Sequence, residues 1–404
     1  FHIFTLPTAD TADIFLNIFN EKPIFSRKEV IHIMKIICSK SNLLKSVSIS
    51  LKAVPSKTTM PILECILIDA TTNQIKFTTN DMELGIETIV EGTIEEKGKV
   101  ALNAKIFYEI IRRLPDNDVT IKTDEKFAAT ITCEKAKFNI PGKSGEDFAY
   151  LPMIERDEPL TISQYTLKNM IYQTIFSIAV NDNNKLMTGE LFEIKDNCLK
   201  IVSLDGHRIA IRKMPLKKDY SDRKVVVPGK TLNEISKILS GEMDDVVSIF
   251  FTNNHILFEF DQTMVVSRLI EGEYFRIDQM LSSDYETKLS INKKEFLDCI
   301  DRATLLVREG DKKPIIIHIT DGSMELKIDS AMGSMNEDID IEKEGKDILI
   351  GFNPKFLIDA LKVIDDETID IYLVNPKAPC FIRDEEETYT YLILPVNINQ
   401  NQAR

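Results

Sequence analysis

The sequence predicts an α+β protein of three similar domains, each with two helices packed on antiparallel sheets. A short strand leads into a helix over residues 100–114, 225–239 and 350–364, and this places Lys105, Lys230 and Lys355 at a constant interval of 125 residues. A second repeat, a strand start followed by an apolar helix, covers residues 38–54, 162–178 and 291–307. A period of about 125 residues suits a domain rather than a solenoid repeat. We therefore expect domains at 34–157, 158–286 and 287–404.

The remaining strands recur within each unit. One short strand is expected at 75–77, 199–201 and 326–328, and alternating patterns indicate strands at 119–121, 129–132, 369–373 and 389–394. Residues 249–251 and 256–258 flank Asn253-Asn254, which is typical of a hairpin. Open sheets leave free edges that a protein must pair or cover, so each domain's edge should pair with the next. Head-to-tail pairing of this kind closes a ring or grows a filament, and we expect the ring.

Composition is that of an ordinary globular protein, with 404 residues, 43% hydrophobic and 28% charged, and a net charge of −14. No apolar run approaches the length of a membrane span. The six cysteines are scattered without a CxxC pair, and the five histidines are widely spaced. This spacing argues against a metal site and a disulfide framework and fits a reducing cytosol. We expect a cytoplasmic protein without metal or cofactor.

The segment 1–33 matches neither of the other two units. It lacks the charged start, continuous apolar run and cleavage site of a signal peptide. We expect an N-terminal extension that is not part of the fold, the alternative being a genuine N-terminal arm. Residues 400–404 are expected to form a short disordered tail.

Each helix of the first repeat carries two basic residues seven positions apart, which nearly eclipse on the side opposite its apolar face. These six residues are Lys105 and Arg112, Lys230 and Lys237, and Lys355 and Lys362. If the units curve with these helices inside, the cations would hold duplex DNA through its phosphates without reading bases. The alternative is ordinary helix decoration, because Glu109, Glu234 and Asp359 are expected on the same exposed faces.

Several segments resemble the bacterial replicative sliding clamp, the beta subunit of DNA polymerase III. Residues 60–63 (MPIL) resemble its "LPIL" segment, residues 204–210 (LDGHRIA) its "TDGHRLA" signature, and residues 391–396 (YLILPV) its C-terminal ending. With the triple repeat, the resemblance runs from Met34 to about Asn399. It implies a homodimeric ring without catalytic activity, with helices lining the hole and sheets outside. Such a ring encircles duplex DNA, tethers the replicative polymerase and confers processivity.

The resemblance also implies three sets of site residues. Lys57 and Asn181 match loop positions that touch DNA. A groove between the second and third domains takes linear peptides from the polymerase, the clamp loader and repair proteins. Its matching residues are Met187, Leu204, Gly206, His207, Arg208, Ile209, Phe275, Met280, Leu392, Leu394, Pro395, Val396 and Asn397. Phe275 and Asn397 depart from the proline and arginine that are common in the family. Phe138 and Ile140 with Leu305 and Leu306 match the dimer interface.

Other interpretations stay open at this point. Leu392 and Leu394 alternate as an ordinary buried strand would. A repeat-built scaffold that never meets DNA would show the same three units. A hydrolase using Asp205 and His207 lacks an accompanying nucleophile motif such as GxSxG. A trimeric clamp of the two-domain type is disfavoured by the three repeats.

Overall fold

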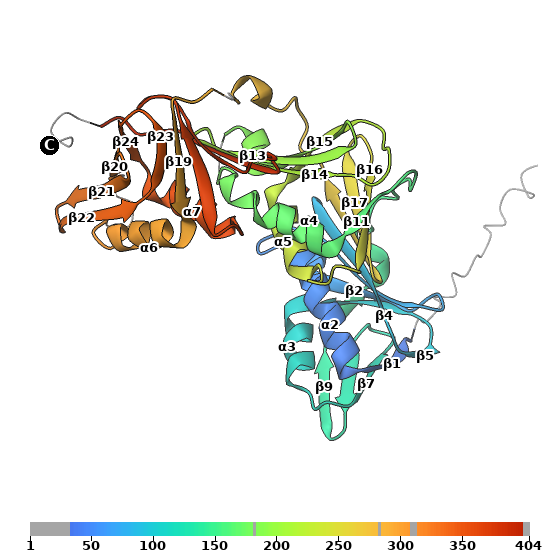
Figure 1. The fold of residues 1–404 in the computed structure, drawn as a ribbon. Helices are drawn as coiled ribbons and strands as arrows, with labels where there is room; N and C mark the ends of the chain where they lie inside the picture. Colours follow the sequence, from blue (N-terminus) through green and yellow to red (C-terminus); the bar gives the residue numbers. More distant parts are fainter. Residues whose placement is uncertain (1–32, 181–182, 282–283, 308–312, 399–404) are drawn as a thin grey trace, which may run out of the picture.

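The protein is described by a computed structural model that covers residues 33–180, 183–281, 284–307 and 313–398. Three domains follow one another along an arc (Figure 1). The six α-helices of the described residues, α2 to α7, lie on its concave side, and the sheets form its convex side (Figure 1). This curvature agrees with the arrangement that the repeats predict.

The first domain contains two helices and ten strands. They are β1 (Lys35–Ser39), α2 (Lys40–Ser50), β2 (Cys65–Asp69), β3 (Ile75–Asn80), β4 (Leu84–Val90), β5 (Thr93–Glu96), β6 (Lys99–Asn103), α3 (Ala104–Arg113), β7 (Asp118–Thr123), β8 (Ala129–Cys133), β9 (Ala136–Ile140) and β10 (Gly142–Ser144).

The other two domains repeat this order with small changes. The second contains β11 (Leu160–Ser163), α4 (Gln164–Tyr172), β12 (Gly189–Lys195), β13 (Cys198–Leu204), β14 (Arg208–Pro215), β15 (Arg223–Pro228), α5 (Gly229–Ile238), β16 (Val246–Phe251), β17 (His255–Phe260) and β18 (Thr263–Arg268). The third contains β19 (Thr287–Asn292), α6 (Lys293–Thr304), β20 (Ile315–Thr320), β21 (Ser323–Ser330), β22 (Gly333–Asp340), β23 (Glu342–Gly345), β24 (Ile348–Phe352), α7 (Pro354–Val363), β25 (Thr368–Leu373), β26 (Cys380–Arg383) and β27 (Tyr389–Ile393).

Four of the described α-helices, α2, α3, α6 and α7, begin where a short polar side chain caps them directly after a strand. The Asn103 side chain accepts a hydrogen bond from the Ile106 amide at the start of α3, and Asn353 accepts one from the Lys355 amide at the start of α7. Such caps satisfy amide groups that have no partner within the helix. In α3, Phe107 is fully buried against the core. The exposed side is therefore left to the basic residues.

Two nine-stranded sheets run across the domain boundaries. One has the order β10-β6-β2-β3-β4-β18-β17-β16-β11, and the other has the order β15-β12-β13-β14-β27-β26-β25-β19-β23. At the first boundary β4 pairs with β18, with Ile86 opposite Val265. At the second boundary β14 pairs with β27, with Ala210 opposite Tyr391. The predicted edge-to-edge pairing of neighbouring domains is confirmed inside the chain.

The two remaining sheets lie at the ends of the arc. Their orders are β5-β1-β7-β8-β9 and β22-β21-β20-β24. In the repeat, β9 corresponds to β18 and β27, whereas β22 corresponds to β4 and β14. Within the described part of the chain, β9 and β22 each pair on one side only. The chain thus forms the same strand junction twice. The two strands that could form a further junction of this kind, β9 and β22, are left at opposite ends of the arc.

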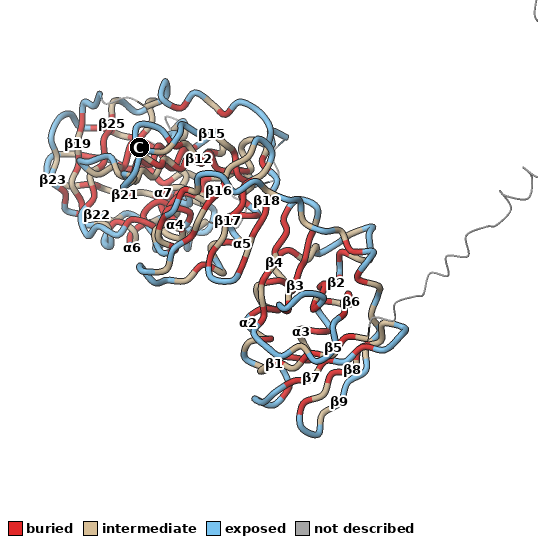
Figure 2. Tube along the Cα trace, turned by 90° about the vertical axis from the view of Figure 1, so that its right-hand side faces the viewer, coloured by how far each residue is buried: buried red, intermediate tan, exposed pale blue. Residues whose placement is uncertain are grey.

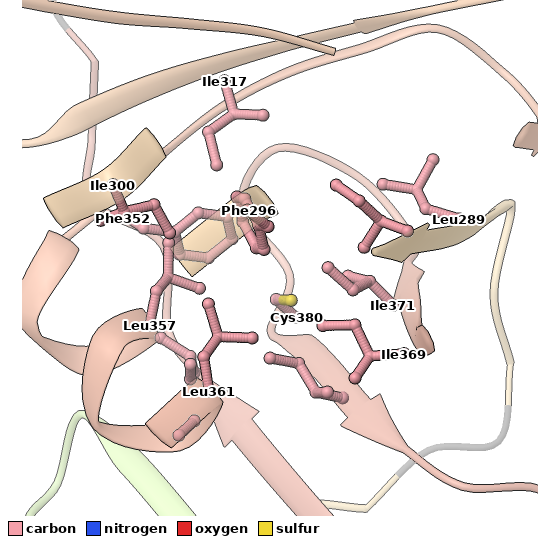
Figure 3. Packing of buried hydrophobic residues seen from close by; sticks show 14 of the residues in the cluster. Leu289, Phe296, Ile300, Ile317, Phe352, Leu357, Leu361, Ile369, Ile371 and Cys380 are labelled. Atoms are coloured by element: carbon pink, nitrogen blue, oxygen red, sulfur yellow. The ribbon is translucent and has the colours of Figure 1, made fainter. Parts of the chain in front are cut away.

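Each domain has its own apolar core between helices and sheets, and buried residues gather inside each unit (Figure 2). In the third domain, Phe296 of α6 and Leu357 and Leu361 of α7 pack with Ile317 and Ile371 from the sheets (Figure 3). Paired strands buried by helices on one face exclude water from the backbone ladder and fix the helix positions. The positions of the concave helices are therefore set by their packing on the sheets.

Candidate functional sites: a cationic inner face and an apolar groove

All six predicted cations are exposed on the concave helices. They are Lys105 and Arg112 on α3, Lys230 and Lys237 on α5, and Lys355 and Lys362 on α7. Equivalent placement in the three domains follows from the 125-residue interval. The concave side therefore carries a regular row of basic side chains.

The ion pairs of these cations differ between helices. Arg112 pairs with Glu109 at 2.8 Å, and Lys237 pairs with Glu234 at 2.7 Å. Lys230 pairs with Asp81 of the first domain and so joins two domains. Among the described residues, none of the other three, Lys105, Lys355 and Lys362, has an acidic partner within 4 Å.

Asp359 departs from the sequence prediction. We expect it on the exposed face of its helix, but its carboxylate turns to Arg208 in the second domain, with Nη1 2.7 Å from Oδ2. The reason is tertiary, because the pairing of β14 with β27 brings Arg208 beside α7.

Of the two loop residues predicted to contact DNA, one lies in the described part of the chain. Lys57 is exposed in the segment that joins α2 to β2. Asn181 lies outside the described residues.

A cavity of about 430 Å³ lies at the junction of the second and third domains. Ten of the thirteen predicted groove residues line it together with Pro379: Met187, Leu204, Gly206, His207, Arg208, Ile209, Phe275, Met280, Leu392 and Leu394. Leu204, Ile209 and Leu392 come from β13, β14 and β27, which the second boundary pairing brings side by side. The other apolar lining residues lie outside the strands, in the segments that precede or follow them. Most of these side chains are apolar, so the cavity suits an apolar ligand segment.

The lining of the cavity differs from the prediction at four positions: three predicted residues are absent from it and one further residue is present. Pro395, Val396 and Asn397 follow β27 but do not line the cavity, because the Val396 amide donates to the Gly351 carbonyl at 2.8 Å and carries the chain along β24. Pro379 reaches the cavity from the loop before β26. It gave no sequence signal, because only the sheet order places that loop beside β27.

Arg208 forms the buried side of the groove and is only 7% exposed. Its Nε lies 3.0 Å from Asp205, and its Nη2 donates to the Phe176 carbonyl at 2.6 Å. The guanidinium also lies 4.5 Å from the centre of the Phe356 ring. A guanidinium held by two carboxylates, a carbonyl and a ring has little freedom to rotate.

The hydrolase interpretation is contradicted by the geometry of Asp205 and His207. Asp205 Oδ1 accepts from the backbone amides of His207 and Arg208, and its Oδ2 is paired with Arg208. The carboxylate thus closes a turn and does not orient the imidazole as a triad acid does. His207 instead stacks on Phe356, with ring centres 6.1 Å apart.

A buried acid lies behind the groove. Glu190 on β12 is fully buried, and no donor within the described structure bonds to its carboxyl oxygens. The nearby Thr174 hydroxyl donates to the Met170 carbonyl instead. Burial raises the pKa of Glu190 to about 8. The same environment raises the pKa of Tyr274, whose hydroxyl donates to the Val202 carbonyl.

The predicted dimer residues lie at the two ends of the arc. Phe138 on β9 is 39% exposed and Ile140 is half-buried. Leu305 directly follows α6 and is 75% exposed, whereas Leu306 packs against the third core, as does Met335 of β22. Apolar side chains therefore accompany both free sheet edges.

The described ranges contain neither a metal-ligand cluster nor a membrane-spanning helix. No group of three or more metal-ligating side chains occurs among those residues. Of the helices that the structure describes, none is long and apolar enough to span a membrane. The six cysteines are all free, and five are buried.

A curved three-domain chain with cations along its inner helices and matching free edges at its ends defines a ring-forming clamp. The chain belongs to the DNA polymerase III beta subunit family. Its N-terminal, central and C-terminal domain models match residues 34–152, 161–275 and 278–397.

Known proteins agree with this assignment over most of the chain. A beta sliding clamp from Staphylococcus aureus strain Mu50 is 35% identical over 358 residues, which cover 86% of this chain and 95% of the relative. The crystal structure of a putative DNA polymerase III beta subunit from Eubacterium rectale is 70% identical, with a TM-score of 0.89, 90% of this chain and all of that chain covered. The Bacillus subtilis sliding clamp is 34% identical, with a TM-score of 0.88 and coverages of 91% and 100%.

The family assignment confirms the three-domain clamp fold, and the family implies a dimeric ring. The chain is a beta sliding clamp and acts as a non-catalytic processivity factor of DNA polymerase III. DNA and polymerase are the partners that this family implies.

Proposed function

We propose that two copies of this chain pair head to tail into a ring that encircles duplex DNA in the cytoplasm without reading its sequence. The observation that carries the proposal is the row of six exposed cations at equivalent points of α3, α5 and α7. These residues, with Lys57 and Asn181, are the proposed contacts to phosphates. We retain 34–157, 158–286 and 287–404 as the domain division. Apart from residue 33, the expected N-terminal extension 1–33 lies outside the described residues.

The charge distribution favours a ring that slides. The chain has a net charge of −14, so the cations of the inner face are local and the protein as a whole repels a polyanion. Duplex DNA presents about one negative charge per 1.7 Å of axis. A sparse row of basic side chains therefore finds phosphates at a similar distance wherever the protein stands along the duplex. Contacts to phosphates alone carry no sequence information, so they hold the duplex without fixing its register.

The ring would close by a third copy of the junction already made twice. Val265 faces Ile86 at the first boundary, and Tyr391 faces Ala210 at the second. Transferred to the free edges, the same relationship places Phe138 of one protomer opposite Met335 of its partner. Ile140, Leu305 and Leu306 would flank this contact. Pairing these edges also removes two exposed strands that would otherwise template aggregation.

The apolar groove is the proposed site for short linear peptides from the polymerase, the clamp loader and repair proteins. Its volume of about 430 Å³ falls within the usual range of ligand pockets. Met187 and Met280 stand among its lining residues, and flexible methionine side chains suit a surface that accepts several partners. Pro395, Val396 and Asn397 would contact a peptide only beyond the cavity itself.

The decisive experiment loads the protein on nicked circular DNA with a clamp loader and then cuts the circle. A ring around the duplex stays bound to the circle and slides off the linear ends. Retention that does not depend on DNA ends would contradict the proposal and favour a scaffold that assembles proteins without encircling DNA.

A further inference from the structure

The acidic residues at equivalent positions of α3, α5 and α7 have different partners. Glu109 pairs with Arg112 and Glu234 with Lys237, each with the basic residue three positions later. Asp359 has Lys362 three positions later, yet its carboxylate pairs with Arg208. The first two helices each neutralise one of their own cations, and α7 does not.

Arg208 is built into the molecule in a way that keeps Asp359 in place. It is the first residue of β14, and it is buried at the junction of the second and third domains. Asp205 and the Phe176 carbonyl hold two sides of the guanidinium, and Asp359 takes Nη1. The Phe176 and Phe356 rings also lie 5.4 and 4.5 Å from the guanidinium. These contacts hold Arg208 in place, so the carboxylate of Asp359 is drawn toward the groove and away from the solvent side of α7.

We propose that Arg208, a residue of the apolar groove, sets the charge of the DNA-facing helix α7 by holding Asp359 away from Lys355 and Lys362. Asp359 lies four positions after Lys355 and three before Lys362, and these are the spacings at which ion pairs form on a helix. Without Arg208, its carboxylate would be released to pair with one of these lysines. It would then neutralise a cation as Glu109 and Glu234 do. Arg208 thus links the groove to the charge of the inner face. This inference rests on the proposed role of the α7 lysines.

The test measures binding of a fluorescent linear duplex, whose free ends thread a closed ring without a loader, by anisotropy at several salt concentrations. Arg208→Met should weaken binding about three- to tenfold and lower the slope of log K against log salt by about one phosphate contact. The double variant Arg208→Met/Asp359→Asn should restore both values. Arg212→Met is the matched control on the same strand, because Arg212 bonds to Thr388 and not to α7. It should bind as the unchanged protein does.

Unchanged binding by Arg208→Met, or equal loss in the single and double variants, would overturn the inference. A second comparison leaves Arg208 intact. Glu109→Gln frees both Arg112 and Arg113 and should raise duplex affinity, whereas Asp359→Asn should raise it less. Equal gains would also overturn it. Lys355→Ala/Lys362→Ala tests the underlying function separately, because normal duplex binding by this variant shows that α7 does not contact DNA. Sedimentation of every variant establishes that the dimer is intact.

Discussion

Leu151 packs directly on Gly85 at the junction of the first and second domains. Gly85 pairs with Val266 there, and the equivalent pair at the second junction is Ile209 with Leu392. Leu151 and Ile154, from the connection between domains, cover the outer apolar face at the first junction. At the second junction the corresponding face is left as the groove. The same strand pairing therefore carries a covered apolar surface at the first junction and an open groove at the second.

Gly85→Ala should destabilise the first junction by about 1–3 kcal/mol, because a Cβ at this position would overlap the Leu151 side chain and force the connection outward. Urea unfolding measures the change. Gly241→Ala is the control, since nothing lies within 4 Å of a Cβ there. Equal stability of the two variants would contradict the packing relationship.

Phe275→Ala should weaken peptide binding about tenfold. The Phe275 ring lines the groove and stands edge-on to Tyr274, with ring centres 5.5 Å apart, so truncation removes one wall. Anisotropy with labelled linear peptides from the replicative polymerase gives the affinity. Met243→Ala, at an exposed position away from the groove, should bind normally. Undiminished affinity of Phe275→Ala would remove Phe275 from the site.

Phe138→Cys combined with Met335→Cys should form a disulfide between protomers under mild oxidation. Residues directly opposite on antiparallel strands have Cα atoms about 4.5–5.5 Å apart, within the range that a disulfide spans. Asn139→Cys with Met335→Cys is the control, because a shift of one residue points the side chain to the other face of the sheet. Non-reducing gel electrophoresis detects the product. Equal crosslinking of both pairs would refute the proposed register.

Leu305→Asp with Leu306→Asp should convert dimers to monomers, because charged groups would be buried beside the paired edges. Sedimentation velocity reports the mass. Met153→Asp changes a fully exposed residue away from the sheet ends and should leave the dimer intact. A persistent dimer in the double variant would place the interface elsewhere.

Stability should fall as pH rises through the range set by Glu190. Its pKa is raised from 4.5 to about 8 in the folded protein, so the folded state holds a proton that the unfolded state has lost between these values. This contribution is complete below pH 4.5 and is gone above about pH 8, with a slope of about 1.4 kcal/mol per pH unit at most. Glu190→Gln should flatten the profile of unfolding free energy over that window. An unchanged profile would show that Glu190 does not titrate there.

Local pattern was sufficient to predict the architecture. The 125-residue interval predicted three units, and the angle of about 100° per residue placed Lys105 and Arg112 opposite Phe107. The structure agrees, because a helix that buries one stripe must expose the other. Ten of the groove residues were named through resemblance to the clamp family, since His207 or Leu392 alone resembles an ordinary structural residue.

The sequence by itself determined the repeated module, its helices and the faces that carry the cations, because these depend on neighbours within a few turns of chain. Only the tertiary structure decided that Asp359 turns to Arg208, that Pro379 reaches the groove and that Leu151 covers Gly85. Each of these contacts joins residues far apart in sequence. Their side-chain directions follow from which sheet edges meet, and no local pattern encodes that choice.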